Sequence, residues 1–168
     1  MKPIHWLVIF CALCHVTLSA ARMATSLHAL QLDADPAVIG LLIALYGASA
    51  ALASVPVGRL ADRQPARPLI MVCLALLGGG TLLPFFWESL IALGIAGLLV
   101  GGGYFALYII NSNLAARYGS GPERAGNFAL MHMSLSGANV VGPLVAGFGI
   151  DYLGHAHTFL LLALLPVG

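Results

Sequence analysis

The chain has 168 residues, of which 60% are hydrophobic and 8% are charged, and its net charge is +1. A soluble domain carries charges on roughly a quarter of its residues, so this composition excludes a water-soluble fold. The small net charge and the lack of a Lys/Arg-rich run also exclude a nucleic-acid-binding protein.

Apolar segments long enough to cross a bilayer recur along the chain. About 20 apolar residues in a helix span the ~30 Å hydrocarbon core, and backbone that faces lipid must be helical to pair its polar groups. We therefore expect an all-α, polytopic membrane protein with a bundle of six transmembrane helices in the lipid bilayer. The predicted spans cover residues 4–24, 38–57, 69–86, 90–114, 127–150 and 158–168.

The first span also resembles a secretory signal, because Lys2 precedes an apolar run that ends in small residues. That run is long for a signal, which favours a retained span. Its polar residues His15, Ser19 and Arg22 are spaced i, i+4, i+7 and share one helical face. Polar groups at bilayer depth need a partner or a water-filled cavity, so we expect this face to line a substrate cavity.

Two of these residues allow a second interpretation. His15 lies roughly 16 Å into the bilayer, near the midplane, where it can contact substrate or protons or simply hydrogen-bond another helix. Arg22 lies about 27 Å from Ile4, near the outer interface, where its guanidinium can bind an anion or extend into the headgroups.

The join after the second span carries a specific motif, which reads Gly58-Arg59-Leu60-Ala61-Asp62-Arg63-Gln64-Pro65-Ala66-Arg67. It resembles the signature loop of the major facilitator superfamily, G-x-L-a-D-R-x-G-R-K/R, which lies between the same two spans. The positions that match are Gly58, Leu60, Ala61, Asp62, Arg63 and the terminal Arg67, whereas Pro65 and Ala66 replace the usual Gly and Arg. The resemblance implies a gating loop that steadies the outward-facing state, with Asp62 accepting backbone hydrogen bonds and pairing with an Arg.

The third span has one mid-length hydroxyl, on Thr81, and we expect it to face lipid at the periphery. In the fourth span Tyr104, Tyr108 and Asn111 repeat the i, i+4, i+7 spacing and form a second polar face. Tyr104 is predicted to be a cavity wall, and Tyr108 fits either the cavity or an interfacial aromatic belt.

The fifth span carries the third polar face, formed by His132, Ser136 and Asn139. Asn139 comes out near the depth of His15, where it can line the cavity or bond another helix. The same span resembles the antiporter motif of the superfamily, G-x8-G-x3-G-P-x2-G-G. The matching positions, at which we expect close helix packing and a bend, are Gly142, Pro143 and Gly147.

The sixth span has only some ten residues, about half of what a crossing needs, so we expect the chain to be a fragment. Three histidines lie in or near the joins on the outer side and are expected to be solvated. They are His28, His155 and His157.

The joins carry nearly all of the charge, and their sign alternates. Six of the seven basic residues lie ahead of the first span or in every second join, namely Lys2, Arg59, Arg63, Arg67, Arg117 and Arg124. The intervening joins hold Asp33, Asp35, Glu88 and Asp151. The positive-inside rule then places the N-terminus and the basic joins in the cytoplasm.

Nothing in the sequence indicates an enzyme or a cofactor. Cys11, Cys14 and Cys73 lie in apolar runs and are expected to pack as small hydrophobes. No two His or acidic residues stand at ligand spacing within a span, so no metal site is predicted. The nucleophile elbow, the P-loop and the dinucleotide-binding motif are also missing.

The resemblance covers almost the whole chain and implies the N-terminal six-helix half of a transporter, built from two inverted three-helix repeats. It implies transport of a small molecule by alternating access, as proton-coupled efflux across a bacterial inner membrane. The expected partners are the substrate, protons and a C-terminal six-helix half, without which we expect no transport. The fourth-span Arg that the family links to proton coupling is missing. A metabolite importer or uniporter of the same fold, and a membrane scaffold or subunit that does not transport, are the alternatives.

Overall fold

The structure is a computed structural model that describes residues 3–117 and 121–166, and these residues form helices and no strand. The predicted all-α fold is therefore confirmed. Five helices are long and apolar enough to cross a membrane, and the last is shorter. The helices are α1 (Pro3–Gln31), α2 (Pro36–Arg63), α3 (Ala66–Phe86), α4 (Leu90–Arg117), α5 (Pro122–Leu153) and α6 (His155–Leu164).

Proline and glycine set several of the helix ends. α2 begins at Pro36 and α5 at Pro122, where the missing N–H of proline has no helical partner to lose. Gly154, with a φ of 82°, separates α5 from α6. Polar residues that are compatible with a helix extend most helices past the apolar spans. α1 in particular continues to Gln31, whereas the predicted span ends at residue 24.

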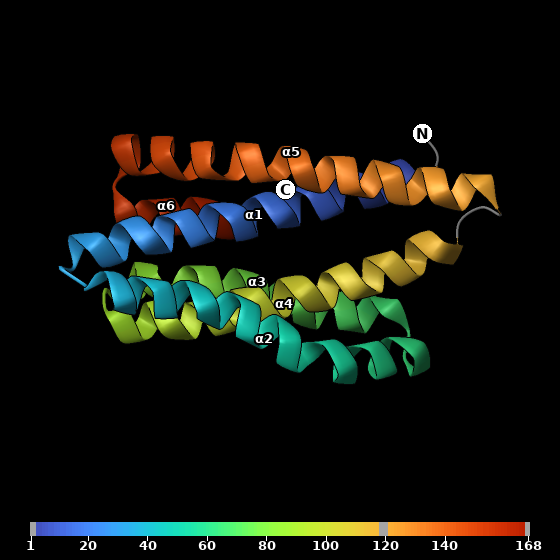
Figure 1. Cartoon of the computed structure of the whole chain (residues 1–168), viewed down its shortest axis with the longest axis horizontal. Coiled ribbons are helices and arrows are strands. Elements are labelled where there is room, and N and C mark those ends of the chain that lie inside the picture. The colour runs from blue at the N-terminus through green and yellow to red at the C-terminus, as the bar shows by residue number, and fades with distance from the viewer. Residues whose placement is uncertain (1–2, 118–120, 167–168) are drawn as a thin grey trace.

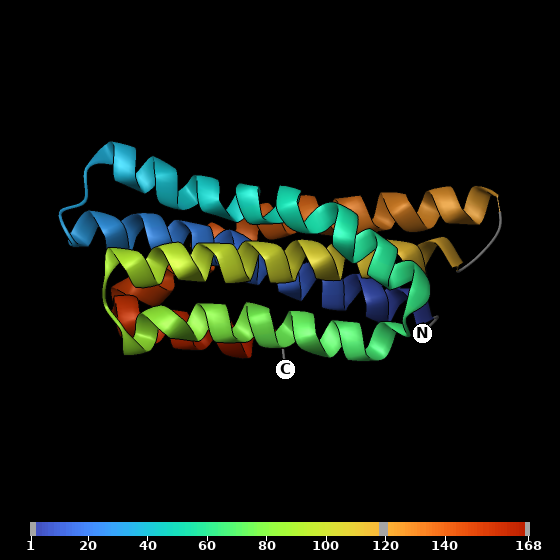
Figure 2. The same ribbon diagram turned by 90° about the horizontal axis from the view of Figure 1, so that it is seen from below.

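The six helices run back and forth along the long axis of the bundle, so that the joins alternate between its two ends (Figures 1 and 2). One end holds the joins α1–α2, α3–α4 and α5–α6, and the described acidic residues beside them are Asp33, Asp35, Glu88 and Asp151. We call this the acidic end. The opposite end, which we call the basic end, carries Arg59, Arg63, Arg67, Arg117 and Arg124.

The helix pairs follow the pattern of two inverted repeats. α1 packs chiefly against α5, and α2 packs chiefly against α4. In two inverted three-helix repeats, α1 corresponds to α4 and α2 corresponds to α5. The α1–α5 pair therefore corresponds to the α4–α2 pair, and both are major contacts of the bundle. α4 also contacts α1 and α3, so it lies at the centre of the bundle and is buried around most of its circumference.

Glycines on α4 allow the close approach of α2. A Cβ atom at Gly97 would lie 2.9 Å from the Tyr46 ring, and one at Gly101 would overlap the Tyr46 carbonyl oxygen. The spacing Gly97-x-x-x-Gly101 therefore marks a helix contact in this bundle, which small residues make possible.

Candidate functional site

His15 of α1 connects two other helices through its imidazole ring. The Tyr104 hydroxyl of α4 lies 2.5 Å from Nδ1, and the Asn139 side-chain oxygen of α5 lies 3.1 Å from Nε2. A neutral imidazole has one N–H and one unprotonated nitrogen, so a single tautomer satisfies both contacts. In that tautomer Nε2–H donates to Asn139 Oδ1, and the Tyr104 O–H donates to Nδ1. We refer to these three residues as the His15 hub.

The hub has a buried side and an open side. Tyr104 is 2% exposed, whereas His15 is half-buried and Asn139 is exposed. The polar faces of α1, α4 and α5, which helical spacing identifies separately, thus meet at one imidazole. On its open side, this imidazole adjoins a surface that continues along α1 and α5.

Two of the three predicted cavity residues on α4 do not line an open space. Tyr104 is buried, and Asn111 is 0% exposed, with its side chain beside Cys11 of α1. Both lie inside the bundle because α4 is its central helix, which spacing within one helix does not reveal. Tyr108 is half-buried and stacks on Tyr104, with ring centroids 6.4 Å apart.

The other predicted residues lie toward the surface. Arg22, His132 and Ser136 are exposed, and Ser19 is half-buried. The Ser136 hydroxyl donates to the His132 carbonyl oxygen at 3.1 Å, a bond within α5. Together with Asn139, these residues give α1 and α5 a polar surface beside the hub, which we call the polar face.

Arg22 lies at two hollows that share its side chain and that of Ile43. The first, of about 430 Å³, lies between α1, α2 and α4, and its other lining residues are Leu18, Gly40, Ala44, Tyr46, Gly47 and Phe105. The second, of about 250 Å³, is also lined by Ser19, Met23, Ser26 and Pro143 from α1 and α5. We call them the Arg22 hollows.

Sequence reasoning missed the contribution of α2 to these hollows. Gly40, Ala44 and Gly47 line the larger hollow, and they are spaced i, i+4, i+7 like the polar stripes. A stripe of small residues at this spacing was therefore the signal that could have identified α2 as one side of the larger hollow.

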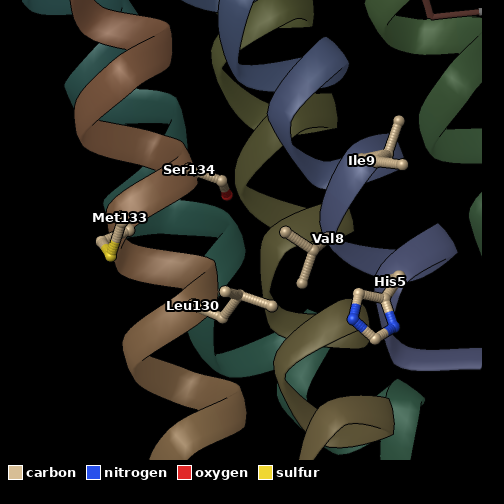
Figure 3. Close-up of a pocket in the computed structure, with 6 residues that line it drawn as sticks. All are labelled: His5, Val8, Ile9, Leu130, Met133 and Ser134. Atoms are coloured by element: carbon tan, nitrogen blue, oxygen red, sulfur yellow. The ribbon is translucent and has the colours of Figure 1, made fainter. Parts of the chain in front are cut away.

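A third hollow lies nearer the basic end and takes in none of the predicted site residues. This hollow has a volume of about 310 Å³. Figure 3 shows the residues that line it, which are His5, Val8 and Ile9 on α1 and Leu130, Met133 and Ser134 on α5. Its lining is mostly apolar, unlike the polar face.

The predicted packing positions on α5 differ from one another. A Cβ atom at Gly142 would lie 2.6 Å from Ser19 Cβ and 2.9 Å from the Ala20 backbone nitrogen of α1. Nothing lies within 4 Å of the corresponding position at Gly147, so the prediction of close packing there is wrong for this bundle. Pro143 is half-buried inside α5 and lines the smaller Arg22 hollow.

Substituting alanine at Gly142 is expected to lower the stability of the bundle by about 1–3 kcal/mol, because the new methyl group overpacks the α1–α5 contact. The matched variant Gly147→Ala adds a methyl group in open space and is expected to leave the melting temperature unchanged or slightly raised. Thermal unfolding of both purified variants in detergent measures the difference. Equal melting temperatures would contradict the assigned contact.

The predicted gating loop connects α2 to α3 at the basic end. α2 ends at Arg63, and the Gln64 backbone N–H donates to the Leu60 carbonyl oxygen at 2.9 Å. Pro65, one of the departures from the signature, precedes α3 with a φ of −58°, which proline favours. Asp62, Arg63 and Arg67 are exposed, and a Cβ at Gly58 would meet nothing within 4 Å. In the described part of the chain, Asp62 forms no ion pair, so the expected latch is not engaged here.

His28 is buried, contrary to the expectation that it is solvated. Its side chain is 2% exposed, and its ring centroid lies 5.1 Å from that of His155 and 6.0 Å from that of Phe159. The reason is that α1 continues to Gln31, which directs His28 toward α6. His155 is half-buried, and His157 is exposed.

The chain was compared with a family model and with curated proteins. The family model of the Major Facilitator Superfamily matches residues 6–167, which is nearly the whole chain. The search of curated proteins gave no match. The family match agrees with the resemblance of the loop between α2 and α3 to the signature of this family.

Proposed function

The chain belongs to the Major Facilitator Superfamily, and we propose that it forms the N-terminal six-helix half of a transporter that exports a small molecule in exchange for protons. The family suggests an integral membrane protein that transports small molecules and is not an enzyme. The observation that supports the site is the polar face of α1 and α5 beside the His15 hub. Polar side chains at bilayer depth are costly against lipid and are tolerated beside a water-filled cavity.

The same face supports a second six-helix half as the partner. Arg22, His132, Ser136 and Asn139 are exposed on the two helices that border the hub. A second bundle opposite this face would close a cavity at the midplane, and rocking of one bundle against the other would open it to either side.

The hub supports the proton-coupled version of this function. Imidazole is the side chain whose charge changes most readily near neutral pH. A proton on Nδ1 of His15 would remove the acceptor for the Tyr104 hydroxyl and so weaken the link between α1 and α4. Import or uniport remains the alternative function. It is favoured because the family links an Arg in the fourth span to proton coupling, and α4 has no basic residue before Arg117 at its end.

Transport by the complete gene product tests the function. We expect substrate export from energised vesicles to stop when a protonophore dissipates the proton gradient. Transport that continues at the same rate would favour a uniporter.

We also propose that the basic end faces the cytoplasm of a bacterial inner membrane. In that case Arg63→Cys would react with a membrane-impermeant thiol reagent in inverted vesicles and not in intact cells, and the reverse labelling would reject this orientation.

Replacing Asp62 with asparagine is expected to slow transport by the complete protein about tenfold. The expected latch contributes charge-assisted hydrogen bonds worth about 1.5–3 kcal/mol in the outward-facing state, and the neutral amide loses most of that energy. Arg59→Gln is the matched control, because Arg59 is exposed in the same segment at a position that the signature leaves free. Initial transport rates at equal expression measure the effect, and an unchanged rate for Asp62→Asn would reject the latch.

A further inference from the structure

We propose that Arg22 is an anion-binding residue of the cavity and that the transported molecule carries a carboxylate, phosphate or sulfate group. This inference rests on the proposed transport function, and it adds the substrate class. It follows from the position of Arg22 along α1, the charges around it and the space beside it.

Arg22 lies inside α1 and not at its end. Gln31, where α1 ends, lies nine positions after Arg22, which corresponds to about 13 Å along the helix. The residues at its hollows have a similar depth, since Ile43 lies about 10 Å from the start of α2 and Pro143 about 15 Å from the end of α5. Arg22, Ile43 and Pro143 therefore lie at a similar level of the bundle, on the half nearer the acidic end.

The guanidinium of Arg22 has no counter-charge in the described residues. It forms no ion pair or side-chain hydrogen bond with any of them, and neither Arg22 hollow is lined by Asp or Glu. The other described charged residues lie between helices or near helix ends, the farthest being Arg59, four residues before the end of α2. A cation without a counter-charge beside a cavity attracts anions, and its charge-assisted hydrogen bonds to a carboxylate or phosphate are stronger than bonds between neutral groups.

The space beside Arg22 fits a small organic anion. The larger hollow, of about 430 Å³, falls within the range of roughly 300–1,000 Å³ that is typical of small-molecule sites. Gly40 and Gly47 keep it open, because a Cβ at either position would meet nothing within 4 Å. Ser19 lines the smaller hollow, and its hydroxyl is available to donate a hydrogen bond to a carboxylate or phosphate oxygen.

Thermal unfolding of the complete transporter with defined probes tests this inference. The anionic probes are sodium succinate, inorganic phosphate and sulfate, the cationic probe is tetraphenylphosphonium, and sodium chloride keeps the ionic strength equal. We expect at least one anion to raise the melting temperature by about 2–4 °C, and the cation to have no effect. The shift should vanish in Arg22→Gln and be reduced in Arg22→Lys, which keeps the charge but loses the planar fork.

Two further variants separate binding from folding. Arg59→Gln removes an exposed charge at the basic end, at a position that the signature leaves free, and should keep the full shift. Gly47→Leu should reduce the shift, because it fills the larger hollow while Arg22 is retained. Stabilisation by the cation alone, or an anion shift that persists in Arg22→Gln, would overturn the inference.

The accessibility of position 139 separates failure of this inference from failure of the proposed function. If Asn139→Cys reacts with aqueous reagents while no anion gives a shift in melting temperature that depends on Arg22, the cavity is supported and only the substrate class is wrong. If position 139 is shielded in every state, the cavity itself is absent and both proposals fail.

Discussion

Replacing His15 with leucine is expected to lower transport by the complete protein about 100-fold while leaving the protein in the membrane. The substitution removes both hydrogen bonds of the hub, to Tyr104 on α4 and to Asn139 on α5. It also leaves the buried Tyr104 hydroxyl without its partner. A lost hydrogen bond costs about 0.5–1.5 kcal/mol, and an unpaired buried group costs about 1–3 kcal/mol. Initial rates, normalised to the amount of protein in the membrane, measure the loss.

The control for this prediction is His157→Leu, because His157 is exposed at the acidic end and is remote from the hub in the fold. It should retain the wild-type rate. His15→Gln restores at most one of the two bonds and should fall between the wild type and His15→Leu. If His15→Leu transported at more than half the wild-type rate, the hub would not be the functional centre.

The variant Gly101→Ala is expected to give the largest loss of stability, about 3 kcal/mol or more. Its methyl group would overlap the Tyr46 carbonyl oxygen of α2, and backbone cannot move aside as the end of a side chain can. α2 and α4 would have to separate, and this contact would lose its close packing. The yield and melting temperature of monodisperse protein in detergent measure the effect.

The neighbouring substitution Gly102→Ala provides the matched control. A Cβ atom there would lie 3.7 Å from Ser49 Cβ, an ordinary van der Waals distance, so we expect near wild-type stability. Equal yields and melting temperatures for the two variants would show that the α2–α4 contact does not depend on the absence of a side chain at position 101.

The helices and the polar faces could be predicted from the sequence because they depend on local periodicity. His15 and Asn139 lie 124 positions apart, yet spacing and depth alone predicted that both face a common interior, and they form a hydrogen bond. Hydropathy located the apolar middle of each helix but not its end. α1 continues to Gln31 because Thr25, Ser26 and His28 are compatible with a helix even though they end the apolar run.

The remaining features depend on packing between helices. Asn111 shares a face with Tyr108, but only the central position of α4 determines that Asn111 is fully buried. Gly142 and Gly147 are chemically identical, and only the crossing of α1 over α5 gives the first a tight contact and the second open space. The hollows beside Arg22 likewise require α2, whose wall of small residues carries no polar signal.

The water accessibility of position 139 tests most directly whether the polar face of α1 and α5 lines a transport cavity. In the complete protein, we predict that Asn139→Cys reacts with a hydrophilic thiol reagent from at least one side of the membrane, and that substrate slows the reaction. Met71→Cys, exposed on the outer surface of α3, should remain unreactive because it faces lipid. A cysteine at position 139 that resists the reagent from both sides, in every state, would contradict the cavity.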